Sequence, residues 1–185
     1  ELRAFTPLGR GAVLAFRTRV GALIPIDESN LPPLVARFSA GGPLSMRGYY
    51  TGRLSGMVRQ RGEWVPVGGN GVADGSLELR LGRGGTLGAV VFVDAAAVAE
   101  ASKLPTAYQT ALDPTRLQWA AGLGLRWRTP FGPLRLDVAA RLPDRLDGPW
   151  NERFPSVPYT FWDLEKKYPH REPIVAVHFA LGEAF

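Results

Sequence analysis

The stretch that decides the fold is WAAGLGLRWRTPFGPLRLDVAAR, from Trp119 to Arg141. Apolar side chains occupy every second position on either side of the turn at Thr129–Pro133: Trp119, Ala121, Leu123, Leu125 and Trp127, then Leu134, Leu136, Val138 and Ala140. A period of two over this length predicts two long β-strands, each with one apolar and one polar face. Tryptophans at both ends of the apolar face, and arginines on the polar face, favour a membrane β-barrel over a soluble sandwich.

The same alternation recurs along the chain. It marks strands near residues 14–24, 77–81, 87–96 and 175–185, and residues 2–6 fit the end of one more strand. With the hairpin this makes six strands and part of a seventh. Most of them have the roughly 9–11 residues that a tilted membrane-spanning strand needs. The sequence therefore predicts an all-β fold, a transmembrane antiparallel up-and-down β-barrel.

The connections between these strands alternate strictly in length. Short ones at Pro7–Gly11, Gly82–Thr86 and Thr129–Pro133 are interleaved with long ones at Pro25–Gly71, Val98–Arg116 and Pro143–Glu172. Outer-membrane barrels have short turns on the periplasmic side and long loops outside. A soluble sandwich has no reason to keep this order, so the pattern supports up-and-down threading through a membrane.

The amino-acid composition argues against several classes of protein. The 185 residues include no cysteine, so the chain has neither disulfides nor a thiolate metal site. The mean hydropathy of −0.05 is low for a helical membrane protein, and the longest apolar run, residues 88–98, contains Asp94. The net charge of +5 comes mostly from arginines dispersed over strands and loops, not from one basic stripe, so nucleic acid is not expected as a partner.

No catalytic or cofactor motif stands out. The two histidines, His170 and His178, lie in different contexts without metal-ligand spacing. Ser45 is not in a Gly-x-Ser-x-Gly elbow, and the glycine cluster at residues 68–71 is not followed by the Lys of a phosphate loop. We therefore expect no enzymatic activity, no metal and no cofactor; the glycine cluster suggests a flexible entry into a strand.

A further pattern lies in the long connection at residues 25–71. It contains Arg37-Phe38, then Gly41-Gly42, then Met46-Arg47-Gly48-Tyr49. This resembles the loop-6 signature of the Omp85 superfamily. Other segments resemble family motifs in the same order: residues 66–71, 76–80, 91–94, 128–137 and 178–185. One departure is Met46, where the family usually has Val or Ile.

The resemblance implies that residues 1–185 are the C-terminal part, about half, of a 16-stranded barrel, with residues 25–71 as a loop that enters the lumen. It also implies that Arg47 folds inward and pairs with Glu78 and Asp94 on the barrel wall. The residues by themselves agree on facing, since parity places both carboxylates on the face away from lipid, where a cation is a favourable partner. Without the family motifs, the residues favour an exposed loop arginine with no partner.

The two residues after Arg47 have expected roles in the same contact. Gly48 would let the loop backbone approach the wall closely or take a positive φ, and Tyr49 would anchor against the inner wall. Near the C-terminus, Phe179, Leu181, Gly182 and Phe185 resemble the family's terminal strand signal. Residues 173–185 would then form one side of a weak seam, with Gly182 loosening local packing.

The implied function is assembly or insertion of outer-membrane proteins in the bacterial outer membrane, by pairing of an incoming strand at the seam. Implied partners are outer-membrane lipid, nascent outer-membrane or secreted proteins, periplasmic POTRA domains and accessory subunits. Two alternatives stay open: a protein-translocating pore of the two-partner-secretion type, and a barrel that anchors a soluble effector domain.

The strand count raises a separate question. Six or seven strands do not close a normal single-chain barrel, and lipid does not tolerate an open sheet edge. Three explanations are open: a fragment that lacks its first strands, a half barrel completed by another chain, or an eight-stranded barrel with one unrecognised strand.

Overall fold

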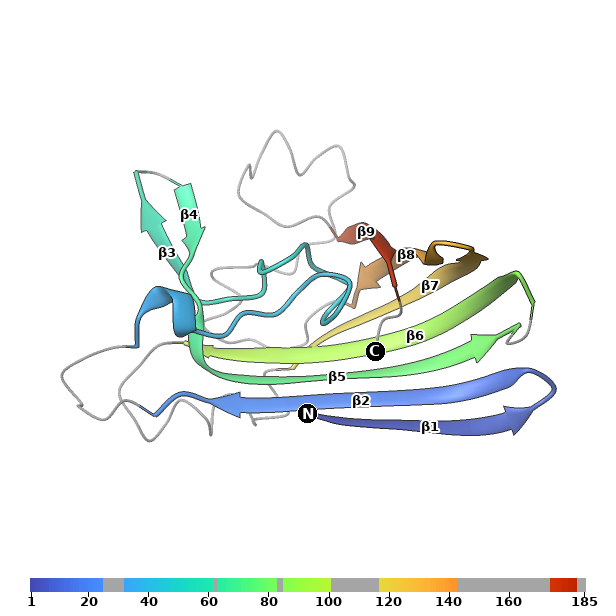
Figure 1. The fold of residues 1–185 in the computed structure, drawn as a ribbon. Coiled ribbons are helices and arrows are strands. Elements are labelled where there is room, and N and C mark those ends of the chain that lie inside the picture. The colour runs from blue at the N-terminus through green and yellow to red at the C-terminus, as the bar shows by residue number, and fades with distance from the viewer. Residues whose placement is uncertain (25–31, 62, 83–84, 101–116, 143–173, 183–185) are drawn as a thin grey trace.

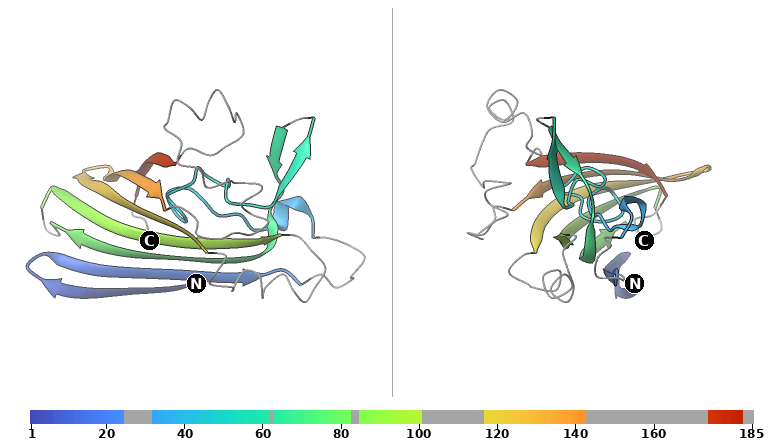
Figure 2. Two further views of the ribbon diagram at one scale, coloured as in Figure 1. Left: turned by 180° about the vertical axis from the view of Figure 1, so that it is seen from behind. Right: turned by 90° about the vertical axis from the view of Figure 1, so that its left-hand side faces the viewer.

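The computed structural model describes residues 1–24, 32–61, 63–82, 85–100, 117–142 and 174–182. Seven strands form one antiparallel sheet that curves into an open trough (Figures 1 and 2). In spatial order they are β1 (Leu2–Gly9), β2 (Ala12–Ala22), β5 (Gly69–Leu81), β6 (Leu87–Glu100), β7 (Gln118–Thr129), β8 (Gly132–Arg141) and β9 (Val175–Leu181). Each strand pairs with the next one in this order, so the predicted all-β up-and-down fold is confirmed.

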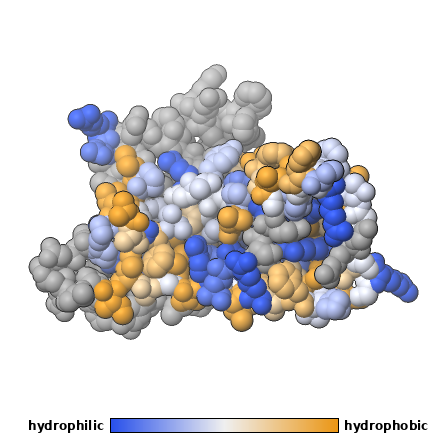
Figure 3. Space-filling model, viewed as in Figure 1, coloured by the Kyte–Doolittle hydropathy of each residue, from blue (hydrophilic) through white to orange (hydrophobic). Residues whose placement is uncertain are grey.

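Burial along the strands is inverted relative to a soluble protein. Large apolar residues on the outer face are exposed, for example Leu123, Leu125 and Trp127 at 64%, 57% and 52%. Charged residues on the inner face are buried, among them Glu78 and Asp94. Figure 3 views the molecule from the open side of the trough. Hydrophilic side chains gather on this side, among apolar ones. Such an apolar outer band is what a lipid-facing barrel wall requires.

Tight turns join the strands at one end of the trough, to the right in Figure 1. Arg10 and Gly11 connect β1 to β2, and both have positive φ angles, 48° and 77°. The turn between β7 and β8 is shorter than the predicted Thr129–Pro133, because Thr129 already pairs with Gly132. Pro7 likewise lies inside β1. Short hairpins at this end agree with the predicted order of connections.

The glycine cluster at residues 68–71 leads into strand β5, as predicted. Strand β5 already begins at Gly69, so the connection from β2 is shorter than residues 25–71. A Cβ atom on Gly69 would lie 1.8 Å from the carbonyl oxygen of Ala99 on β6. Gly69 therefore lies in close contact with the backbone of β6, beside a register shift between Gly69 and Gly71.

The connection between β2 and β5 contains three elements that alternation did not predict. They are a 3₁₀ turn, η1 (Leu34–Ala36), and a hairpin of β3 (Met57–Gln60) and β4 (Glu63–Pro66). Strands β3 and β4 pair only with each other and add nothing to the seven-stranded sheet, in which β1 and β9 are the two edges. The described residues therefore contain no eighth strand of the wall, which an eight-stranded barrel would need.

Residues 37–56 of this connection lie inside the trough, as Figures 1 and 2 show. Isolated bridges fix its path, Phe38 to Gly69 on β5 and Ala40 to Leu54 within the loop. An apolar cluster forms between loop and wall: Ala40, Met46, Tyr49 and Leu54 from the loop, with Val72, Ala96, Val98 and Ala120 from the strands. The residues of the expected loop-to-wall contact sit next to this cluster.

Candidate functional site

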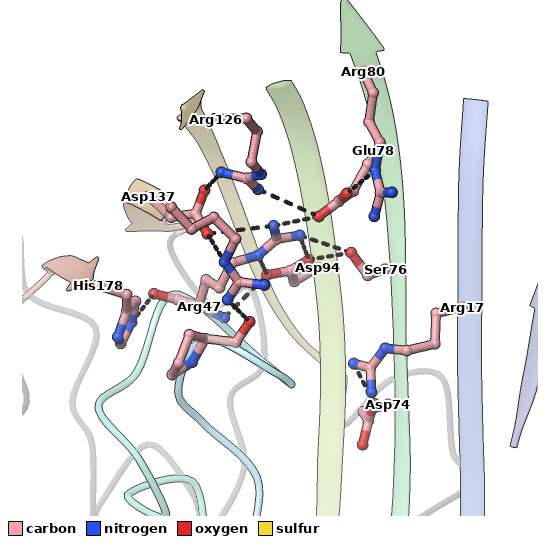
Figure 4. A network of polar contacts seen from close by, with 12 residues as sticks. Arg17, Arg47, Asp74, Ser76, Glu78, Arg80, Asp94, Arg126, Asp137 and His178 are labelled. Atoms are coloured by element: carbon pink, nitrogen blue, oxygen red, sulfur yellow. Dashed lines mark hydrogen bonds and ion pairs between the residues drawn. The ribbon is translucent and has the colours of Figure 1, made fainter. Parts of the chain in front are cut away.

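The centre of the site is Arg47, a loop residue that is 1% exposed. Its guanidinium donates hydrogen bonds to Glu78 Oε1 on β5 at 2.5 Å and to both carboxylate oxygens of Asp94 on β6. The two bonds to Asp94, at 2.8 Å and 2.6 Å, form the bidentate fork that suits arginine and carboxylate. The structure thus brings together the three charged residues of the expected contact (Figure 4).

Strand register explains why two further residues join the contact. Asp94 is paired with Ser76, and Glu78 is paired with Phe92, in adjacent positions of the β5–β6 ladder. The Ser76 hydroxyl donates to Asp94 Oδ1 at 2.6 Å and accepts from Arg47 Nη2 at 2.8 Å. The guanidinium also lies over the Phe92 ring, 3.4 Å from its centroid, as in a cation–π contact.

Ser76 and Phe92 were not among the predicted partners of the loop arginine. A signal was present, because both share the inward parity of Glu78 and Asp94 on the same strands. Only the register between β5 and β6 shows that the four residues form one patch beneath the guanidinium.

Charge neutralisation around Arg47 holds the arginine firmly in its ionised form. Burial by itself lowers the pKa of Arg47, but the hydrogen bonds to Asp94 and the charges of Asp94, Glu78 and Asp137 outweigh it, so the pKa is raised above its usual value. Arg47 is therefore a permanent cation. Removing one partner of such a buried pair leaves an uncompensated charge, which costs about 3–5 kcal/mol.

Gly48 is required by space and not by backbone conformation. Its φ is not among the positive values of the described chain. A Cβ atom there would lie 2.6 Å from Cβ of Ala120 on β7 and 2.9 Å from Cγ of Arg141 on β8. Of the two expected roles for this glycine, close approach to the wall is the one that the geometry supports.

Tyr49 lies against the inner wall and is 2% exposed. Its hydroxyl donates to Gln118 Oε1 at 3.1 Å, and the Arg141 guanidinium lies 4.6 Å from its ring centroid. The backbone nitrogen of Tyr49 also bonds to the Met46 carbonyl at 3.1 Å, which closes a tight turn around Arg47 and Gly48. The segment Met46–Tyr49 is thus a compact plug on the wall.

The inner face of β7 makes room for this network with small residues. A Cβ atom on Gly122 would lie 2.4 Å from the Phe92 ring, and one on Gly124 would lie 2.1 Å from Asp137 Oδ1. Ala120, which faces Gly48, completes the set at every second position. The small residues that alternate with Trp119 to Trp127 therefore have a packing reason.

A second group of charges surrounds the Arg47 contact. Arg80 Nε donates to Glu78 Oε2 at 2.8 Å. Arg126 Nη1 donates to Asp137 Oδ1 at 2.6 Å, and Arg135 Nε lies 3.3 Å from Asp137 Oδ2. Arg135 also reaches the loop, where it donates to the Pro43 carbonyl at 2.6 Å. These side chains tie β5, β7 and β8 to the loop in one polar network (Figure 4).

Residue His178 links the edge strand β9 to the same loop. Its Nε2 lies 2.9 Å from the Arg47 carbonyl oxygen. Since a carbonyl only accepts, this ring nitrogen carries the proton. The ring also makes an edge contact with Tyr50 at 5.9 Å. Nothing in the sequence around His178 indicates this bond to the loop.

A separate ion pair braces the wall between β2 and β5. Asp74 accepts from Arg19 Nε at 2.6 Å, and its other oxygen lies 2.8 Å from Arg17 Nη2. Arg17 and Asp74 are both buried. This pair lies away from the loop arginine and has no counterpart in the expected site.

The residues of the expected terminal strand signal are not part of this contact. Phe179 and Leu181 point outward from β9, at 70% and 66% exposure. Gly182 follows the strand with a φ of 101°, and a Cβ there would meet nothing within 4 Å. Its backbone conformation, and not a packing gap, explains the glycine. Phe185 and His170 lie outside the described residues.

Two negative findings complete the description. Among the described residues, no group of His, Cys, Asp and Glu is arranged to hold a metal ion. No helix in that part of the chain has the length and apolarity needed to cross a membrane.

The outward apolar band, the polar inner wall and the inserted loop define a β-barrel wall of the outer-membrane type. A family model described as the Omp85 superfamily domain matches residues 1–185. The chain therefore belongs to the Omp85 superfamily, and the resemblance seen in the sequence is confirmed.

A solved structure agrees with this assignment. The chain is similar to BamA from Haemophilus ducreyi lacking POTRA domains 1–3, with a TM-score of 0.59 and 24% sequence identity. The match covers 76% of this chain and 30% of that chain. The chain therefore spans less than a third of the BamA structure. The structural likeness supports the β-barrel fold of the matched residues.

Proposed function

We propose that this chain is the C-terminal part of the barrel of a factor that assembles or inserts outer-membrane proteins in the bacterial outer membrane. It acts without bond chemistry and without a cofactor. An incoming strand pairs with the backbone edge of β9, which is strand addition at a seam. Membership of the Omp85 superfamily and the likeness to BamA support this class of function.

The observation that carries the proposal is the state of β9. This strand has seven residues, whereas β6 has fourteen, and among the described strands it has a neighbour on one side only. A short edge strand with unpaired backbone groups is a template for another strand. Its side chains Val175, Val177, Phe179 and Leu181 face outward, where lipid would cover them.

The loop contact has a supporting role in this proposal. Through Arg47 the loop is bonded to β5 and β6 by side-chain bonds and to β9 by the carbonyl bond from His178. The same guanidinium lies 3.9 Å from Asp137 on β8. One loop residue thus ties the firmly paired wall to the edge strand. We infer that it holds β9 in place until a substrate strand pairs there.

The partners follow from the two faces. Outer-membrane lipid covers the apolar outer face, nascent outer-membrane proteins meet the β9 edge, and periplasmic POTRA domains with accessory subunits deliver them. A protein-translocating pore on the same barrel remains the competing function, in which the substrate would pass through the lumen instead of pairing at the edge. A barrel that anchors a soluble effector domain needs neither event.

Crosslinking tests the proposal on the full-length protein in liposomes. Val177→Cys on β9 and Leu125→Cys on β7 place thiols at similar outward exposure, 52% and 57%, in a chain with no cysteine. An unfolded outer-membrane protein carrying one cysteine in its last strand should crosslink at residue 177 and not at residue 125. Its folding should also accelerate over empty liposomes.

Two results would contradict the proposal. Equal crosslinking at both positions would show that β9 is not a pairing edge. Steady ion conduction with no gain in substrate folding would favour the translocating pore.

A further inference from the structure

We propose that an arginine-lined pocket at the turn end of the inner wall binds the carboxylates of an acidic polypeptide segment. The proposal rests on the proposed function, since it names the chemistry by which a substrate chain is held before it reaches the edge of the sheet. The site is distinct from the Arg47 contact, which is satisfied by its own acids.

The pocket has a volume of about 380 Å³ and opens between the turns of three hairpins. Apolar and cationic side chains line it together: Phe5, Val13 and Val90, with Arg80, Arg126 and Arg128. Strand pairing places Phe5 opposite the buried Ala15, so Phe5 faces the trough although β1 is an edge strand. An apolar floor with a cationic rim suits an amphipathic ligand.

Arg126 lines this pocket, and two of its guanidinium nitrogens have no hydrogen-bond partner among the described residues. It is 9% exposed and uses Nη1 for Asp137. Its Nε and Nη2 make no hydrogen bond to any described residue, and Nη2 lies 4.0 Å from Glu78 Oε1. Both atoms are covered in this structure. Buried guanidinium groups without partners are costly, so an oxygen ligand that draws the Arg126 side chain towards the pocket would satisfy them.

Arg128 adds a charge that nothing in the described chain neutralises. It follows Arg126 by two residues, so it has the same inward parity, and no described side chain forms an ion pair with it. Around the pocket and the adjoining network, the arginines 47, 80, 126, 128 and 135 outnumber the carboxylates of Glu78, Asp94 and Asp137. The turn end of the inner wall is therefore cationic.

Arg80 joins the two parts of the pocket. Its Nε is bonded to Glu78, while its guanidinium carbon lies 5.6 Å from the Phe5 ring centroid. The aromatic ring and the cation thus stand side by side at the mouth. A carboxylate next to an apolar side chain would meet both at once.

The chemistry favours a polypeptide carboxylate over the other anions. The side chains of Phe5, Val90 and the three arginines have inward parity, so the apolar and cationic parts of the pocket face the trough and not the bilayer. Free phosphate would leave the apolar floor unused. Planar guanidinium groups bind carboxylates by two parallel bonds, and several such groups on neighbouring strands suit a segment with several acids.

Peptide binding to the full-length protein in detergent micelles tests this site. The probe is a fluorescein-labelled peptide, Gly-Glu-Phe-Glu-Gly, and its matched control has Gln at both Glu positions. We expect the acidic peptide to bind at least tenfold more tightly than the Gln peptide. Arg128→Gln should weaken its binding several-fold, and Arg126→Gln with Arg128→Gln at least tenfold.

Arg10→Gln is the matched control variant. Arg10 lies in the β1–β2 turn at the same end of the trough but does not line the pocket, so binding should change less than twofold. Because the Arg128 side chain makes no hydrogen bond or ion pair to the described part of the chain, Arg128→Gln tests the site even if the Arg126 variant fails to fold.

Several outcomes would overturn the proposal. The first is equal binding of the two peptides, and the second is an unchanged affinity in Arg128→Gln. The third is a loss of affinity in Arg10→Gln as large as the loss in Arg128→Gln. Inorganic phosphate that binds where the acidic peptide does not would assign the pocket to a phosphate group. This assay measures peptide binding and not substrate folding. If the protein binds the peptide but does not accelerate the folding of a substrate, only the proposed function is contradicted, and the pocket assignment stands.

Discussion

Glu78 holds two arginines from different parts of the chain. Its Oε1 accepts from Arg47 of the loop at 2.5 Å, and its Oε2 accepts from Arg80 of the same strand at 2.8 Å. The carboxylate is 0% exposed, so water competes for neither bond. Glu78 therefore connects the loop contact to the arginine pocket, and the stability of both depends on one side chain.

Replacing Glu78 by Gln should release both arginines. The amide keeps the shape of the side chain but loses the charge, so the buried Arg47 and the half-buried Arg80 each lose a charged partner. We expect a loss of about 3–5 kcal/mol in the free energy of unfolding. Urea unfolding of the full-length protein in micelles measures it. An unchanged midpoint would show that the pair adds nothing to the fold.

Arg47 and Asp94 should be strongly coupled. We expect Arg47→Met and Asp94→Asn each to destabilise the barrel, and the double variant to cost clearly less than the sum, with a coupling energy of about 1–3 kcal/mol. The measurement is a double-mutant cycle on the unfolding midpoint. Additive effects would argue against the pair. Arg47→Lys should rescue only part of the loss, because an ammonium cannot form the fork.

Replacing Gly48 by Ala should push the loop from the wall. The new Cβ would lie 2.6 Å from Ala120 and 2.9 Å from Arg141. Overpacking of this kind costs about 1–3 kcal/mol. Gly75→Ala is the matched control, since its Cβ would meet the nearest atom at an ordinary 3.4 Å. If both variants unfold alike, close approach is not the reason for the glycine.

His178→Phe should loosen β9 without removing its ring. The bond to the Arg47 carbonyl is lost, and such a bond contributes about 0.5–1.5 kcal/mol. Backbone amides of Val175–Leu181 should exchange with deuterium up to about tenfold faster, whereas those of β6 should not change. His178→Gln, which keeps a donor, should restore part of the protection. Equal amide exchange in the parent protein and in both variants would show that the His178 bond to the loop does not stabilise β9.

A charge on the outer face should be costly only where lipid covers it. Leu123 on β7 and Leu44 on the loop are similarly exposed, at 64% and 62%. Leu123→Arg should destabilise the protein in lipid vesicles by about 2–4 kcal/mol if the residue lies near the bilayer midplane. Leu44→Arg should have little effect. A neutral Leu123→Arg would contradict the lipid-facing assignment.

Some of the architecture follows from local sequence alone. Parity is a property of consecutive residues, so the strands, their lipid-facing side and the inward side of Glu78, Asp94 and Asp137 could be predicted. The short and long connections gave the order of threading. The meeting of Arg47 with its two acids needed the family resemblance as well, because nothing local says where a loop will fold.

The rest depended on contacts between distant residues. Residues Met57–Pro66 are too short a pattern to predict a hairpin, and the glycines at residues 69–71 resembled a flexible segment until the backbone of β6 was seen against them. The role of His178 required the loop and β9 to be placed together. For Gly69 and for His178, the deciding contact joins residues that are far apart in the sequence.

By itself, then, the sequence determined which residues form strands and which face of each strand is apolar, because both follow from the two-residue period of an extended chain. Only the tertiary structure decided what lies beneath the loop arginine. The β5–β6 register sets Ser76 beside Asp94 and Phe92 beside Glu78, and a shift of one residue would turn these side chains to the lipid.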